Sequence, residues 1–146
     1  MDPRVSNLKT VAECEAFAAN ARERSAPELA DQARRRAVQI RADAHGAKTD
    51  VERECLLAVY AYEEVLTLQK GRRQPASRTW QMIKRHGIVP AVERVVTKRE
   101  VSSGFTALAD MGLMEFAFEA VIVRHPASFS EEAVAISTQR LTPDAR

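Results

Sequence analysis

The sequence is poor in cysteine, and this shortage excludes two classes of protein. Its 146 residues include only Cys14 and Cys55. Two cysteines without a C-x-x-C pair cannot form the framework of a disulfide-rich domain or a zinc or redox motif. Both residues stand among apolar neighbours, so we expect buried thiols.

Aromatic residues and long apolar runs are also scarce. Aromatics make up 5% of the chain, and no segment approaches the roughly 18 apolar residues that a membrane-spanning helix requires. Residues 1–4 do not begin an apolar signal sequence. We therefore expect a cytoplasmic protein, and the abundance of alanine and valine favours close-packed helices over a β-sandwich.

Catalytic motifs are absent too. The sequence contains no P-loop, G-x-G-x-x-G, G-x-S-x-G or H-E-x-x-H pattern. His45, His86 and His125 each precede a glycine or a proline at a predicted helix end, where an imidazole caps free carbonyls. Glu63 and Glu64 are adjacent, so their side chains diverge on a helix by about 100°. These patterns predict a protein that is not an enzyme and holds no metal or cofactor.

Helix start and stop signals are frequent in the first half. Three Thr/Ser-x-x-Glu pairs are typical of capping boxes, in which a hydroxyl and a carboxylate satisfy each other's backbone N–H groups; they are Thr10 with Glu13, Ser25 with Glu28, and Thr49 with Glu52. They predict helices over 11–24, 26–45 and 50–70, and Gly46 and Gly71 end the last two.

The second half predicts shorter helices. Ser77 is a suitable N-cap for a helix that ends at His86 before Gly87. Further helices are expected over 91–98, 113–125 and 131–140, although the valine-rich stretch 92–101 is also compatible with a strand. We predict an all-α fold, a compact bundle of six or seven helices with long N-terminal helices followed by shorter C-terminal ones.

The domain organisation follows from these helix lengths. We expect a single domain over 1–146. It can be subdivided into a long-helix unit, 8–71, and a short-helix unit, 77–141, joined by the basic loop 71–77.

Basic residues are concentrated in one segment. The whole chain has a net charge of only +2, but residues 70–100 contain nine Lys or Arg and two Glu, a net charge of +7. The remainder carries −5. A localised basic region on an acidic body is typical of proteins that bind polyanions.

The helix predicted over 77–86 has two different sides. Trp80 and Ile83 fall on one side, which can anchor the helix, and polar residues fall on the other. Arginine and glutamine can read base edges, and lysine and arginine can contact phosphates. We predict a nucleic-acid interface, with DNA favoured over RNA, formed by Arg72, Arg73, Arg78, Gln81, Lys84 and Arg85, with Lys98 and Arg99 as flanking phosphate contacts.

Two alternatives remain open at this point. The basic side chains can simply form a solvated surface. The chain can also be a helical protein–protein interaction adaptor, whose basic face meets an acidic partner. The apolar segment 105–123 would then meet a hydrophobic partner or a second copy, although a helical segment that is apolar nearly all round is usually buried core.

Three stretches resemble a family of bacterial helical proteins: 76–87 (ASRTWQMIKRHG) and, more loosely, 104–112 (GFTALADMG) and 116–126 (FAFEAVIVRHP). The resemblance covers less than half of the chain. It implies no activity and assigns no functional residue.

Overall fold

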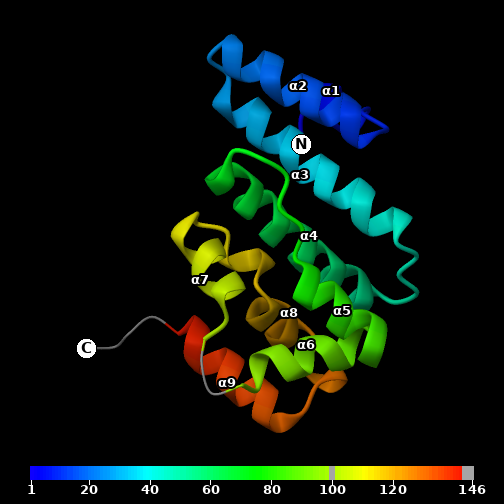
Figure 1. Ribbon diagram of the computed structural model, residues 1–146, viewed down its shortest axis with the longest axis vertical. Helices are drawn as coiled ribbons and strands as arrows, with labels where there is room; N and C mark the ends of the chain where they lie inside the picture. Colours follow the sequence, from blue (N-terminus) through cyan, green and yellow to red (C-terminus); the bar gives the residue numbers. More distant parts are fainter. Residues whose placement is uncertain (99–100, 143–146) are drawn as a thin grey trace. The chain divides into compact units, whose positions relative to one another are not determined.

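The computed structural model describes residues 1–98 and 101–142, and these residues are helical with no β-strand. The chain divides into two compact units, Met1–Gly46 and Ala47–Arg146 (Figure 1). The all-α prediction is therefore confirmed. The division falls at Gly46, whereas the sequence placed its subdivision at the loop 71–77.

The first unit is a helical hairpin with a short leading helix. Its helices are α1 (Pro3–Ser6), α2 (Val11–Glu23) and α3 (Pro27–Ala44). Helices α2 and α3 pack against each other through small side chains, Ala18 and Ala21 on α2 and Ala30 and Ala33 on α3. Small residues at these positions allow the two backbones to approach closely.

The second unit contains the remaining elements, which are α4 (Asp50–Lys70), α5 (Ser77–His86), α6 (Ile88–Val96), α7 (Ser103–Asp110), the 3₁₀ helix η1 (Met114–Phe116), α8 (Phe118–Arg124), η2 (Pro126–Ser128) and α9 (Glu131–Leu141). Helix α4 packs against α6, α7 and α8 (Figure 1). Its apolar stripe therefore supplies the centre of the unit, where Cys55, Val59 and Val65 are buried.

The helix starts follow the sequence signals in part. Thr10 and Glu13 form the predicted reciprocal capping box. Thr49 accepts from the backbone N–H of Glu52 at 3.2 Å. Ser25 does not cap α3, because it has a positive φ of 57° and Ala26 occupies the N-cap without a side-chain bond.

Two predicted features of the second half are wrong in detail, while the helix predicted over 91–98 is confirmed as α6 through Val96 and replaces the strand alternative there. Helix α5 begins at Ser77 itself, so Ala76 is the N-cap and no side chain caps this helix. The helix predicted over 113–125 is interrupted at Ala117, which is extended with φ −70° and ψ 151°. This break buries Ala117 against α4 residues Ala61 and Val65.

Both cysteines are buried, as predicted. Burial, followed by the charges of Glu54 and Glu52, raises the pKa of the Cys55 thiol to about 12. None of the helices among the described residues is both long enough and apolar enough to cross a bilayer.

A single carboxylate oxygen fixes the start of α5 to α4. Glu63 Oε2 accepts one hydrogen bond from the backbone N–H of Ala76 and another from Trp80 Nε1, each 2.7 Å long. The indole ring also lies against Tyr60, with ring centroids 5.0 Å apart. Because α5 has no N-cap side chain, Glu63 supplies the negative charge that a helix N-terminus favours.

Replacing Glu63 should therefore destabilise the second unit. Glu63→Ala leaves two N–H groups without their acceptor, and a hydrogen bond to a charged group contributes about 1.5–3 kcal/mol. We expect the free energy of unfolding to fall by about 3 kcal/mol for the two bonds together. Urea denaturation followed by the fluorescence of Trp80, the only tryptophan, measures this loss.

Two further variants provide the controls. Glu63→Gln keeps one oxygen acceptor and should lose clearly less stability than Glu63→Ala. Gln69→Ala removes an exposed side chain of the same helix and should leave the urea midpoint unchanged. A Glu63→Ala midpoint equal to that of Gln69→Ala would show that this contact contributes no stability.

Candidate functional site

Helix α5 has the two different sides that its sequence predicts. Ile83 is buried and Trp80 is half-buried against α4, whereas Gln81, Lys84 and Arg85 are exposed. The inner side anchors the helix, so the outer side holds long polar side chains on a fixed backbone. Trp80 donates its indole N–H to Glu63 and packs against the ring of Tyr60, so it anchors α5 to α4.

The loop before α5 contributes two more exposed cations. Gly71 ends α4 in the left-handed conformation, with φ 71°, which a residue with a side chain adopts at a cost. Arg72 and Arg73 follow directly and are exposed. After this turn the loop stays against α4, because the backbone N–H of Gln74 donates to Thr67 Oγ1 at 3.2 Å.

The predicted interface residues separate into two groups. All of those that the structure describes are exposed: Arg72, Arg73, Gln81, Lys84 and Arg85, and also Arg78 and Lys98, which in addition contribute to the lining of a pocket. Arg99 lies outside the described residues.

The basic residues of this segment are not neutralised by the residues that the structure describes. None of the eight described Lys and Arg side chains between 70 and 98 forms an ion pair with a described residue; they are Lys70, Arg72, Arg73, Arg78, Lys84, Arg85, Arg94 and Lys98. The one acidic residue of this stretch, Glu93, instead accepts from the backbone N–H and the hydroxyl of Ser130, at 2.9 and 2.7 Å. Its carboxylate therefore binds Ser130, the N-cap residue of α9.

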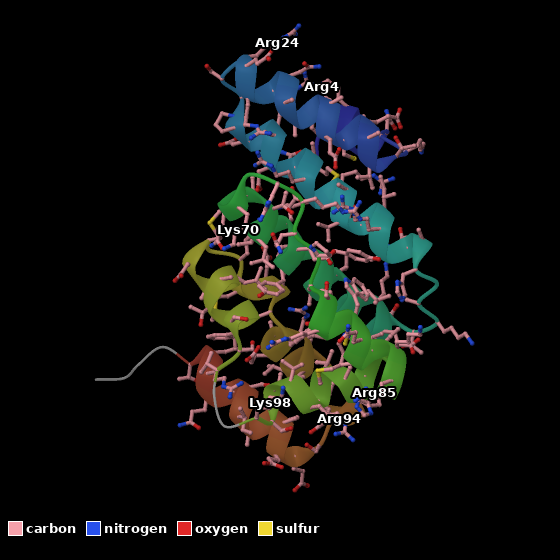
Figure 2. All side chains as sticks on the ribbon, viewed as in Figure 1. Arg4, Arg24, Lys70, Arg85, Arg94 and Lys98 are labelled. Carbon is pink, nitrogen blue, oxygen red and sulfur yellow. The ribbon has the colours of Figure 1, made fainter. Side chains whose placement is uncertain are left out.

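Arg85 and Arg94 come together where α5 meets α6 (Figure 2). Burial, followed by the charges of Arg94 and Arg85, lowers the pKa of His86 from its ordinary value. The local field at this corner is therefore positive. The sequence places Arg94 in the basic segment but not in the predicted interface. Its proximity to Arg85 depends on the turn at Gly87 between α5 and α6, which the sequence pattern does not reveal.

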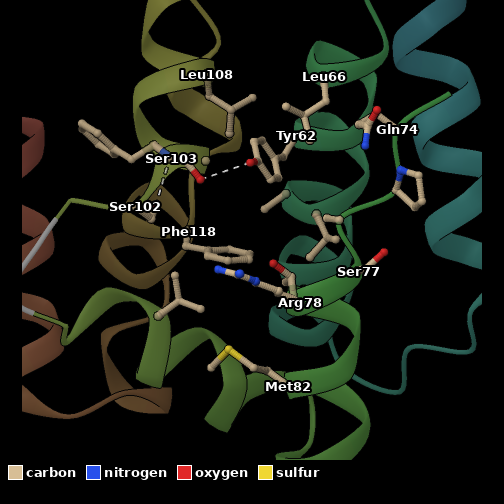
Figure 3. A pocket seen from close by; sticks show the side chains of 18 of the residues that line it. Tyr62, Leu66, Gln74, Ser77, Arg78, Met82, Ser102, Ser103, Leu108 and Phe118 are labelled. Carbon is tan, nitrogen blue, oxygen red and sulfur yellow. Dashed lines mark hydrogen bonds between the residues drawn. The ribbon is translucent and has the colours of Figure 1, made fainter. Parts of the chain in front are cut away.

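A pocket of about 910 Å³ opens between α4, α5, α6, α7 and the start of α8. Figure 3 shows Arg78 extending into it toward Phe118, with Ser102 and Ser103 on the facing wall. Ser103 Oγ and the hydroxyl of Tyr62 are 3.2 Å apart across this wall. No sequence motif indicates the pocket, because its lining comes from five separate elements.

A buried ion pair forms part of the pocket lining. Glu119 is only 1% exposed, and its Oε2 accepts from Arg140 at 3.0 Å. Arg140 also donates to the carbonyls of Val96 and Lys98, both at 3.2 Å. The guanidinium thus links α9 to α8 and to the end of α6, and it fixes the backbone that carries Lys98.

The histidines do not gather into a metal site. In the described part of the chain, no three His, Cys, Asp or Glu side chains are placed to hold a metal ion. His125 lies at the end of α8, as predicted, but its ring pairs with Glu54 and not with free carbonyls. Burial opposes ionisation of Glu54, but hydrogen bonds from His125 and Arg124 outweigh it and lower the pKa of that carboxyl.

The apolar segment 105–123 mostly faces the interior of the second unit. Leu108, Val121 and Ile122 are buried in core clusters with α4, α6 and α9 residues. Met111 and Val123 are exposed, but they lie at the ends of two different elements. Most of the segment therefore contributes to the core.

A comparison of the chain with protein-family models, curated proteins and solved structures finds no match, so a function has to be argued from the site itself.

Proposed function

We propose that this chain is a non-enzymatic nucleic-acid-binding protein, with duplex DNA as its first target, that contacts the phosphate backbone through the loop and helices over 72–94. One observation carries the proposal: eight basic side chains between 70 and 98 have no ion-pair partner among the described residues. Uncompensated cations raise the local potential and attract a polyanion.

The exposed face of α5 supports backbone contacts. Lys84 and Arg85 are exposed on a helix whose inner side is fixed by Ile83 and Trp80. A fixed helix loses little conformational freedom on binding, so its cations can be matched to the spacing of phosphates. Gln81, on the same exposed side, has the amide that can read an adenine edge.

The corner between α5 and α6 extends this surface. Arg85 and Arg94 are close enough for both to act on His86. A phosphate placed between the two guanidinium groups would relieve their mutual repulsion, and arginine binds phosphate with parallel hydrogen bonds. Arg72 and Arg73 precede α5 and add contacts that position the nucleic acid without reading its sequence.

The surface predicts salt-dependent binding. We expect a labelled 20-base-pair duplex to bind with a Kd of roughly 1–100 µM at physiological salt, the range of non-specific DNA contacts. Lys84→Ala combined with Arg85→Ala should weaken binding and flatten the slope of log K against log salt by roughly 1.8, for two lost phosphate contacts. Fluorescence anisotropy at four or more salt concentrations measures both quantities, with single-stranded DNA and RNA tested alongside.

A matched variant separates local contacts from net charge. Arg22→Ala combined with Arg24→Ala removes the same charge from exposed positions of the first unit and should leave the slope unchanged. Equal losses in the two double variants would place the binding surface elsewhere. Absence of binding to every nucleic acid at low salt would reject the proposed function.

His86 provides a second, pH-dependent test. Burial and the charges of Arg94 and Arg85 lower the pKa of His86 in the free protein. A phosphate at this corner would offset the two arginine charges, so the pKa of His86 should rise on binding. By linkage the complex then takes up a proton, and affinity should increase as the pH falls below the ordinary histidine value of about 6.5.

The pKa of each histidine can be followed by NMR titration with and without saturating duplex. We expect the pKa of His86 to be higher with saturating duplex than without it. A His86 pKa that is unchanged by saturating duplex would exclude the α5–α6 corner from the contact surface.

A further inference from the structure

The pocket of the second unit has the size of a small-molecule site. Its volume of about 910 Å³ lies within the range of roughly 300–1,000 Å³ that is usual for ligand pockets. It lies inside a single compact unit, and its walls come from helices that pack against α4.

The walls are largely apolar and include two aromatic rings. Phe105 and Phe118 are half-buried and line the pocket together with Leu66, Met82 and Leu108. These side chains come from α4, α5, α7 and α8. Apolar walls with a few polar groups are typical of sites that enclose the body of an organic molecule.

The polar groups at the pocket are mainly positive. Lys70, Arg78 and Lys98 line it from three different elements, and none has an ion-pair partner among the described residues. In Figure 3 the guanidinium of Arg78 lies inside the pocket, beside Phe118. Three uncompensated cations around an apolar cavity favour an anionic ligand.

The buried carboxylate in the lining does not cancel this charge. Glu119 is paired with Arg140 at 3.0 Å, so the two groups together are close to neutral. The positive charge and the apolar walls of the pocket therefore both favour a ligand with one anionic end and one apolar end.

We propose that this pocket binds a small amphipathic organic anion. Its carboxylate or phosphate head contacts Arg78 and Lys98, and its apolar body lies against Phe105 and Phe118. The pocket shares Lys70, Arg78 and Lys98 with the basic segment that carries the proposed function, but its apolar lining is a separate observation. Binding of a small anion is measured without nucleic acid, so either proposal can fail alone.

Three eight-carbon probes test the proposal: octanoate, octanol and octylammonium, each titrated into the full chain by calorimetry. Octanoate should bind at least about tenfold more tightly than octanol, because a charge-assisted hydrogen bond contributes about 1.5 kcal/mol or more. Octylammonium should not bind. Octyl phosphate in place of octanoate shows which anionic head is preferred, and acetate should bind far more weakly because it has no apolar body.

Variants locate the site. Arg78→Ala should weaken octanoate about tenfold by the loss of one charge-assisted contact and leave octanol unaffected, whereas Arg85→Ala, two turns further along the same helix and outside the pocket lining, should change neither. Val101 is 49% exposed and also lines the pocket, so Val101→Asp should preserve folding and weaken only the anions. Octanoate binding no tighter than octanol, or equal effects of Arg78→Ala and Arg85→Ala, would overturn the proposal.

Discussion

One carboxylate oxygen sets the position of the helix on which both proposals rest. Glu63 Oε2 accepts from the backbone of Ala76 and from the indole of Trp80, so it fixes the N-cap residue and the first turn of α5 together. Helix α5 has no side-chain N-cap of its own. Without this contact the start of α5 would depend on the loop that follows Gly71, and the direction of Arg78 would no longer be defined relative to α4.

Anchoring one side of α5 distributes its cations between two surroundings. Arg78, Lys84 and Arg85 are all exposed, and of these three only Arg78 lines the pocket. The unit therefore holds a high local positive charge, and self-repulsion of this kind opposes folding. The buried pair of Glu119 and Arg140 opposes this repulsion by stabilising the fold, because Arg140 donates to the carbonyls of Val96 and Lys98 and so holds the end of α6.

The sequence predicts local features of this fold well and its tertiary contacts poorly. The capping box at Thr10, the stop at Gly71 and the anchoring side of α5 all depend on residues within one or two helical turns, and they are confirmed. No local pattern predicts the contacts of Glu63, because its two partners lie 13 and 17 residues further along the chain. The break at Ala117 was missed for the same reason, since packing against α4 outweighs local helix preference. The meeting of Lys70, Arg78 and Lys98 at one pocket likewise follows only from the packing of separate helices.

The two proposed surfaces share α5, yet helix geometry keeps them electrostatically distinct. Arg78 and Arg85 are seven residues apart, which at 1.5 Å per residue is about 10 Å along the axis. This distance is close to the Debye length of about 8 Å at physiological ionic strength. An anion beside Arg78 is therefore largely screened from a phosphate beside Arg85 where both groups reach solvent. Coupling between the two sites should grow as salt is removed, and any coupling that persists at high salt would have to pass through the Glu63 contact and a shift of α5 itself.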